Sequence, residues 1–166
     1  DGTTGLYCAS AGSAFMLHHH VAKVHAARGE RANPMGVVSS IAGTLHVNLA
    51  AHYGIRGAVS GFVAACASSS HALGCAVDDI RLGRQTRMLV VGAEEVNAET
   101  VLPFAAMRAL STSSDPQTAS RPFDQQRNGF VAAGGAVCLI LEEAGTARAR
   151  GAPIYAEIAG WGQAAD

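Results

Sequence analysis

The sequence of 166 residues has no excess of charge of either sign and no long hydrophobic run. Twelve lysines and arginines stand against thirteen acidic residues, a formal net charge of −1. Bulk electrostatics therefore does not favour a nucleic-acid partner. No uninterrupted apolar stretch approaches the ~20 residues of a membrane span, and the first residues lack the basic-then-apolar plan of a secretory signal. We expect neither nucleic acid nor a membrane among the partners.

Cysteines are few, and their spacing fits neither a disulfide framework nor a metal site. The four lie at positions 8, 66, 75 and 138, without a CxxC pair or a short Cys/His ligand spacing. The run His18–His20 also fails as a metal site, because adjacent helical residues point about 100° apart. We expect a reducing, cytoplasmic compartment, and no metal or organic cofactor.

Aromatic residues make up only 5% of the chain, although hydrophobic residues make up 49%. The interior must therefore be rich in Ala, Val and Gly, which lets backbones approach closely. The chain is long enough for one domain with its own core, and no internal repeat or low-complexity linker divides it. We expect a single domain over residues 1–166.

Helical and strand patterns alternate along the sequence. Apolar residues at helical spacing predict helices over 10–28, 36–53, 67–82, 99–108 and 144–150. Short apolar runs predict strands over 58–65, 88–93, 129–133, 136–142 and 154–160. The runs 129–133 and 136–142 are separated by two glycines, which predicts a hairpin or a bulged turn. The alternation implies the α/β class, with a mostly parallel sheet and an antiparallel edge.

Cys66 stands out among the polar residues because it occupies a strand-to-helix turn. It is the second cysteine of the sequence and lies in ACASSSHALG, after an apolar run ending GFVAA and before a segment with helical spacing. A thiol at a helix N-terminus faces unpaired backbone N–H groups and the positive end of the peptide dipoles, which favour the thiolate. The pattern predicts a nucleophile that attacks acyl carbonyls. The alternative, a small buried thiol, is the interpretation we keep for the other three cysteines.

Residues near Cys66 that could share in its chemistry have simpler explanations. His71 follows Cys66 by five residues, about 500° of helical rotation, so its ring points away from the helix start. The serines at 68–70 lack a GxSxG elbow and are explained as caps of the first turn. Glu94 and Glu95 follow a strand and point to opposite sides, which suits hydrogen bonding better than paired acid and base work.

The order of motifs resembles that of the β-ketoacyl synthases, the condensing enzymes of fatty acid and polyketide synthesis in the thiolase superfamily. The matching blocks are GTTG, HYGIRGAVSGFVAACASSSHALG, VVGAEE, MRALST, SRPFDQQRNGFVAAGGA and GAPIYAEIAGWGQAAD. The pair EE after its strand and AAGGA after GFV look more like synthase I than synthase II.

This resemblance implies a thiolase-like layered fold, of which the chain is an N-terminal half. Family members begin with a strand ahead of the GTTG block and continue through a duplicated second half that supplies two histidines and a lysine. Neither is present in these residues. We therefore expect the sequence to be a fragment of a longer polypeptide, inactive by itself.

The resemblance also implies roles for single residues. Cys66 would accept an acyl group from acyl carrier protein, and a carbanion from decarboxylated malonyl thioester would then attack the acyl thioester. The backbone N–H of Cys66 would form half of an oxyanion hole. Thr3 or Thr4 would border the acyl pocket, and a plain tight turn is the equal alternative. Arg28 and Arg31 would bind acyl carrier protein, the alternative being two solvated loop arginines.

Other functions and the oligomeric state stay open at this point. A thiolase or a polyketide ketosynthase would differ in its downstream histidines, whereas a non-catalytic subunit that sets chain length would lack the nucleophile. A truncated, interaction-only polypeptide is a further alternative. Relatives form a homodimer through the strand at 58–65, whose small and apolar residues suit pairing with a second copy. The alternative is an internal strand paired within its own sheet.

Overall fold

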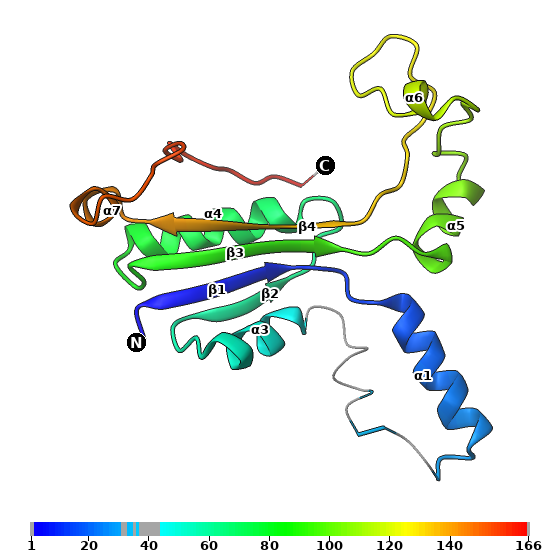
Figure 1. The fold of residues 1–166 in the computed structure, drawn as a ribbon, viewed down its shortest axis with the longest axis horizontal. Coiled ribbons are helices and arrows are strands. Elements are labelled where there is room, and N and C mark those ends of the chain that lie inside the picture. The colour runs from blue at the N-terminus through cyan, green and yellow to red at the C-terminus, as the bar shows by residue number, and fades with distance from the viewer. Residues whose placement is uncertain (1, 31–32, 35, 37–43, 166) are drawn as a thin grey trace. The chain divides into compact units, whose positions relative to one another are not determined.

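The computed structural model describes residues 2–30, 33–34, 36 and 44–165, and Figure 1 shows their secondary structure. By their internal contacts these residues fall into two compact units. The first contains the described residues within Asp1–Gly12, Ile41–Ala93 and Ala136–Asp166, and the second those within Ser13–Ser40 and Glu94–Gly135. The candidate nucleophile, Cys66, lies in the first unit.

The first unit is built on a four-stranded sheet in the order β2-β1-β3-β4. Its strands are β1 (Thr4–Ala9), β2 (Val59–Phe62), β3 (Arg87–Glu94) and β4 (Gly135–Glu142). The first three run parallel, so that Ala9 is level with Phe62 on one side and with Gly92 on the other. β4 runs antiparallel to β3 at one edge (Figure 1). The predicted α/β class, mostly parallel with an antiparallel edge, is confirmed.

Small residues bring helix α4 (Ser68–Arg81) close to this sheet. Ala72 and Ala76 are fully buried and form the core with Ala9, Met88 and Val90 of the strands. This is the Ala-rich and Val-rich packing that the low aromatic content predicts. A second helix, α3 (Leu45–Tyr53), packs against β1 and β2. In the described part of the chain, no helix combines the length and the apolar character that crossing a membrane requires.

The second unit consists of loops and the helices α1 (Ala14–Ala26), α5 (Ala98–Ala106) and α6 (Pro116–Ala119). α1 begins where the Ser13 hydroxyl accepts a hydrogen bond from the N–H of Met16 at 3.0 Å. It packs against α5, which begins with reciprocal hydrogen bonds between Asn97 and Thr100. Phe104 of α5 makes an edge-on contact with Phe130, with 5.2 Å between ring centroids.

The predicted helices agree in position with α1, α4, α5 and α7 (Ala144–Ala149), with ends that differ by a few residues. The largest difference is at 10–28, because Gly12 has a φ of 78° and delays the start of α1 to Ala14. For the helix predicted over 36–53, only the second half can be compared with the structure. It forms α3, whereas 37–43 lie outside the described residues.

Two strand predictions are wrong. Residues 129–133 form no strand and no hairpin with β4; Phe130 makes only an isolated bridge to Leu110. Gly129, with a φ of 138° and the Leu110 backbone against its α-carbon, bends the chain there. Residues 154–160 also form no strand, and the segment 158–164 lies along α4 instead.

Glu142, the last residue of β4, joins two arginines at the edge of the sheet. Arg87 from the start of β3 lies 2.8 Å away and Arg150 from the end of α7 lies 2.7 Å away, whereas the side chain of Glu142 is only 5% exposed. Hydrogen bonds from Arg150 and then Arg87 lower the pKa of this carboxyl from 4.5 to about 2. The ion pairs link β3, β4 and α7.

We expect this cluster to stabilise the fold above pH 4.5 and to lose its effect as the pH falls towards 2, because the folded-state pKa lies below the unfolded one. Glu142→Gln should therefore lower the free energy of unfolding at pH 7. Near pH 2 the variant and the wild type should have similar free energies of unfolding. Urea titrations at several pH values measure this, with Glu157→Gln at an exposed site as the control. A deficit that is equal at every pH would contradict the expectation.

Candidate active site

Cys66 lies in the turn that joins the end of β2 at Phe62 to the start of α4 at Ser68, and its side chain is exposed. In parallel sheets with helical crossovers, the carboxyl ends of the strands are where ligands and reactive groups gather. The predicted strand-to-helix position of Cys66 is therefore the observed one.

The turn around Cys66 is strained and braced. Ala65 has a φ of 48°, in the left-handed region that non-glycine residues rarely adopt, at a cost of about 1 to 3 kcal/mol. The hydroxyl of Ser68 donates to the Ala65 carbonyl and accepts from the Ala64 N–H, each at 2.7 Å. Ser68 is also one of the few buried polar residues. Its hydrogen bonds hold the strained backbone that presents the thiol.

The serines at 68–70 were expected to cap the first turn of α4, and the structure gives two of them other roles. α4 has Ala67 as its N-cap residue and no side-chain capping bond there. Ser68 braces the preceding turn instead. Ser69 approaches β3 so closely that a Cβ on Gly92 would lie 2.7 Å from its Oγ. The missing side chain at Gly92 therefore lets the start of α4 rest on the carboxyl end of β3.

The acidic residues of α4 lie away from the end of the helix that follows Cys66. The helix is 14 residues long and carries no acidic residue in its first turn, whereas Asp78 and Asp79 lie near its far end. The positive end of the helix dipole is therefore the end that follows Cys66 in the chain.

The other three thiols have environments that oppose ionisation. Burial raises the pKa of Cys8 from 9.0 to about 11, with a smaller effect from Cys138. Burial and then the charges of Asp78 and Asp79 raise the pKa of Cys75. Burial also raises the pKa of Cys138.

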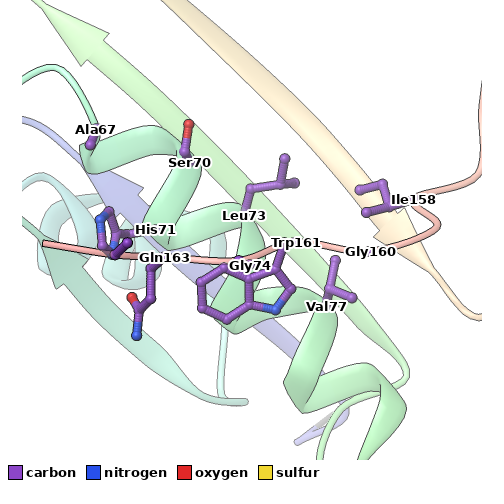
Figure 2. Close-up of a pocket in the computed structure, with 12 residues that line it drawn as sticks. Ala67, Ser70, His71, Leu73, Gly74, Val77, Ile158, Gly160, Trp161 and Gln163 are labelled. Atoms are coloured by element: carbon purple, nitrogen blue, oxygen red, sulfur yellow. The ribbon is translucent and has the colours of Figure 1, made fainter.

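His71 lies on the side of α4 that faces the C-terminal segment, beside Gln163 (Figure 2). Among the described residues of the first unit, no hydrogen bond joins His71 to Cys66.

Glu95 accepts a hydrogen bond from the side chain of Asn97 at 2.6 Å, at the start of α5. Glu95 therefore has the structural hydrogen-bonding partner that we expected for this pair of carboxylates.

Thr3 and Thr4 lie at the opposite end of the sheet from Cys66. Thr4 begins β1 level with Arg87, and the carbonyl of Thr3 accepts hydrogen bonds from the N–H groups of Thr86 and Arg87. Five strand residues, or about 16 Å at ~3.3 Å each, separate Thr4 from the carboxyl end of β1. The structure therefore does not bring either threonine to the thiol.

The turn after β1 is a feature that sequence reasoning missed. Ser10 and Gly12 follow Ala9 at the carboxyl end of the sheet, the same end as Cys66. The N–H of Gly12 donates to the Ser10 hydroxyl at 3.1 Å. The small and polar residues after the strand were the available signal for it.

The two arginines expected to bind carrier protein are only partly described. Arg28 is exposed just beyond α1, with a φ of 48° and its N–H bonded to the His25 carbonyl at 3.1 Å. It belongs to the second unit. Arg31 lies outside the described residues.

Comparisons with known proteins agree with one another. Residues 1–147 match the sequence profile of the Beta-ketoacyl synthase, N-terminal domain. The chain is 42% identical over 170 residues to a 3-oxoacyl-[acyl-carrier-protein] synthase 1 of Haemophilus influenzae, covering 98% of the chain and 41% of that relative. It is 40% identical to a synthase 2 of Vibrio cholerae, covering 82% and 33%.

Solved structures show the same likeness. A β-ketoacyl synthase from Burkholderia phymatum aligns with a TM-score of 0.82 and 34% identity, covering 92% of this chain and 38% of that one. A type II polyketide ketosynthase, solved with its acyl-carrier protein, aligns with a TM-score of 0.80 and 31% identity, covering 93% and 40%. The chain thus spans at most 41% of the length of these relatives.

Proposed function

Because the chain belongs to the β-ketoacyl synthase family, we propose that Cys66 is the acyl-carrying nucleophile of a 3-oxoacyl-[acyl carrier protein] synthase. The observation that carries the proposal is the exposed thiol on a strained turn at the start of α4. Reactive cysteines occur at helix N-termini, and an exposed thiol is accessible to a bulky thioester.

In the first step the Cys66 thiolate attacks the carbonyl carbon of an acyl thioester on acyl carrier protein. A carbon–sulfur bond forms, and the backbone N–H of Cys66 donates one of the hydrogen bonds to the oxyanion. When the intermediate collapses, the carrier thiolate leaves and takes up a proton. The acyl group is then held on Cys66 as a thioester.

In the second step a malonyl thioester loses CO2, and the electrons of the broken carbon–carbon bond form a carbanion. The carbanion attacks the acyl carbonyl, a new carbon–carbon bond forms, and Cys66 leaves as a thiolate. The product is a 3-oxoacyl thioester. The family resemblance implies two further histidines and a lysine from a second half that these 166 residues do not include.

The partners proposed are acyl carrier protein and the acyl and malonyl thioesters. Arg28 and Arg31 would contact acyl carrier protein, since arginines attract negative charge and Arg28 is exposed. We leave Thr3 and Thr4 out of the acyl pocket and place the turn of Ser10 and Gly12 at its edge instead, since that turn shares the sheet end with Cys66. The four free cysteines support a reducing compartment, such as the cytoplasm.

A polyketide ketosynthase is the second candidate, because a ketosynthase of that kind aligns over 93% of the chain. It would use the same nucleophile and differ in its acyl substrate. A non-catalytic subunit that sets chain length fits less well, since Cys66 is present and exposed.

Selective alkylation tests the assignment of the nucleophile. With limiting iodoacetamide at pH 7.5, we expect Cys66 to be labelled first in the intact native protein. A pKa of about 11 leaves Cys8 with about a hundredfold less thiolate than a thiol of pKa 9. Peptide mapping by mass spectrometry identifies the labelled site, and the protein unfolded in urea is the control, in which the preference should vanish. Equal native labelling of all four cysteines would contradict the proposal.

A further inference from the structure

The segment 158–164 runs along α4 in the direction opposite to the helix (Figure 2). At the end of α4, the guanidinium of Arg81 donates to the carbonyls of Ile158 and Ala159 at 3.2 and 2.9 Å. Near the start of the helix, Gln163 lies beside His71 (Figure 2). One short stretch of chain therefore spans the helix from its last turn to the turn that follows Cys66.

Trp161 is the central contact of this segment with α4. Its indole lies directly against the helix backbone at Gly74, where a Cβ would overlap the ring. The indole Nε1 donates to Oδ1 of Asp78, one helical turn further on, at 3.1 Å. Glycine inside a helix lowers its stability. At position 74 the absence of a side chain makes room for the indole of Trp161.

The contact of Trp161 matters because the segment is otherwise loosely packed. A groove of about 380 Å³ remains between 158–164 and the helix. The placement of the segment therefore depends on its few anchors. On the other side of α4, Ala72 and Ala76 are buried against the sheet. The helix is thus held from both sides at the level of Gly74.

We propose that Trp161 is a positioning residue for the nucleophile: by resting on Gly74 and bonding Asp78, it fixes α4 against the sheet and keeps the helix start aimed at Cys66. Gly74 follows Cys66 by eight residues, and α4 begins two residues after Cys66. A shift at Gly74 therefore moves the first N–H groups relative to the sulfur. This inference rests on the proposed role of Cys66.

The test uses four variants of the intact protein. Trp161→Ala removes the ring and the hydrogen bond, and Gly74→Ala keeps Trp161 but displaces its ring. Trp161→Phe retains an aromatic ring on Gly74, and Asp78→Asn retains an acceptor for the indole. The first two disturb the contact and the last two preserve most of it. Trp161 is the only tryptophan of the chain, so its fluorescence reports directly whether the indole has moved in Gly74→Ala.

The measurement is the rate of Cys66 alkylation as a function of pH. We expect Trp161→Ala and Gly74→Ala to move the midpoint of the profile upward by about one pH unit, which lowers the rate near pH 7.5 about tenfold. Trp161→Phe and Asp78→Asn should stay within about threefold of the wild type, which is less than half a pH unit. The titratable or charged side chains of α4 along this contact are His71, Asp78 and Arg81, and His71→Gln checks that the midpoint does not come from the imidazole.

A matched control separates positioning from loss of stability. Glu142→Gln should destabilise the same unit without touching α4, and it should leave the alkylation midpoint unchanged. If Trp161→Ala does not fold, Gly74→Ala decides, because it removes no side chain. Midpoints equal to the wild type in the folded disturbing variants would overturn the inference and leave the proposed function standing. Loss of the preference for Cys66 in the wild type would instead refute the proposed function.

Discussion

Cys66→Ala should abolish the condensation of acyl and malonyl thioesters by the intact protein. Removal of the nucleophile in enzymes with a covalent intermediate costs on the order of 10³-fold or more in kcat, since water or a neighbouring group cannot take its place. The hydroxyl of Ser68 does not replace the thiol, because it is committed to bracing the turn at 2.7 Å on both sides. The measurement is formation of the 3-oxoacyl product under saturating substrates.

Cys75→Ala is the matched control for this loss. Cys75 lies in the same helix, half-buried, with a raised pKa. Its removal should leave kcat within about threefold, because a small apolar residue fits the same site. A Cys66→Ala protein that retains a tenth of the wild-type rate would show that another group carries the acyl chain.

We propose that the intact protein is a homodimer paired through β2, and we expect Val59→Glu to convert it to a monomer and to lower its activity at the same time. β2 pairs with β1 on one side and forms an edge of the sheet in the described residues. Its outer backbone groups are therefore available to a second copy of the strand, as a two-fold axis would require. Cys66 follows the end of β2 by four residues, so an interface formed by β2 would brace its turn.

Val137→Glu on β4 provides the comparison for this interface. Val137 is 65% exposed at the opposite edge of the sheet, whereas Val59 is 37% exposed. Analytical ultracentrifugation and the condensation assay should show a dimeric, active Val137→Glu protein and a monomeric, impaired Val59→Glu protein. A Val59→Glu protein that stays dimeric and fully active would rule out pairing through β2.

The position of Cys66 in a strand-to-helix turn could be predicted because the residues that indicate it are its neighbours in the sequence. An apolar strand, two flanking alanines and a helical pattern follow one another without interruption, and the structure has the same order. The strained φ of Ala65 could not be predicted, since glycine is the usual residue with such a backbone. Its stability comes from the hydrogen bonds of Ser68, which a sequence pattern does not reveal.

Structural features that depend on residues far apart in the sequence could not be predicted. The glycines of the GTTG block suggest a turn, yet Thr4 and Gly5 begin a strand because they pair with β3. Gly134 and Gly135 suggest a hairpin, yet β4, which begins at Gly135, pairs with β3, which lies much earlier in the sequence. The hydrogen bond between Asp78 and Trp161 joins residues 83 positions apart. Such contacts are set by tertiary packing and leave no periodic signal.

The most direct measurement of the central claim is the site of the acyl intermediate. The intact protein is incubated with acyl carrier protein that carries a saturated acyl chain, without malonyl thioester, and is then mapped by mass spectrometry under acidic conditions that preserve thioesters. We expect one acyl group per chain, located on Cys66, absent from Cys66→Ala and removed by hydroxylamine. An acyl group on any other residue, or an acyl group that persists in Cys66→Ala, would contradict the assignment of Cys66 as the acyl-carrying nucleophile.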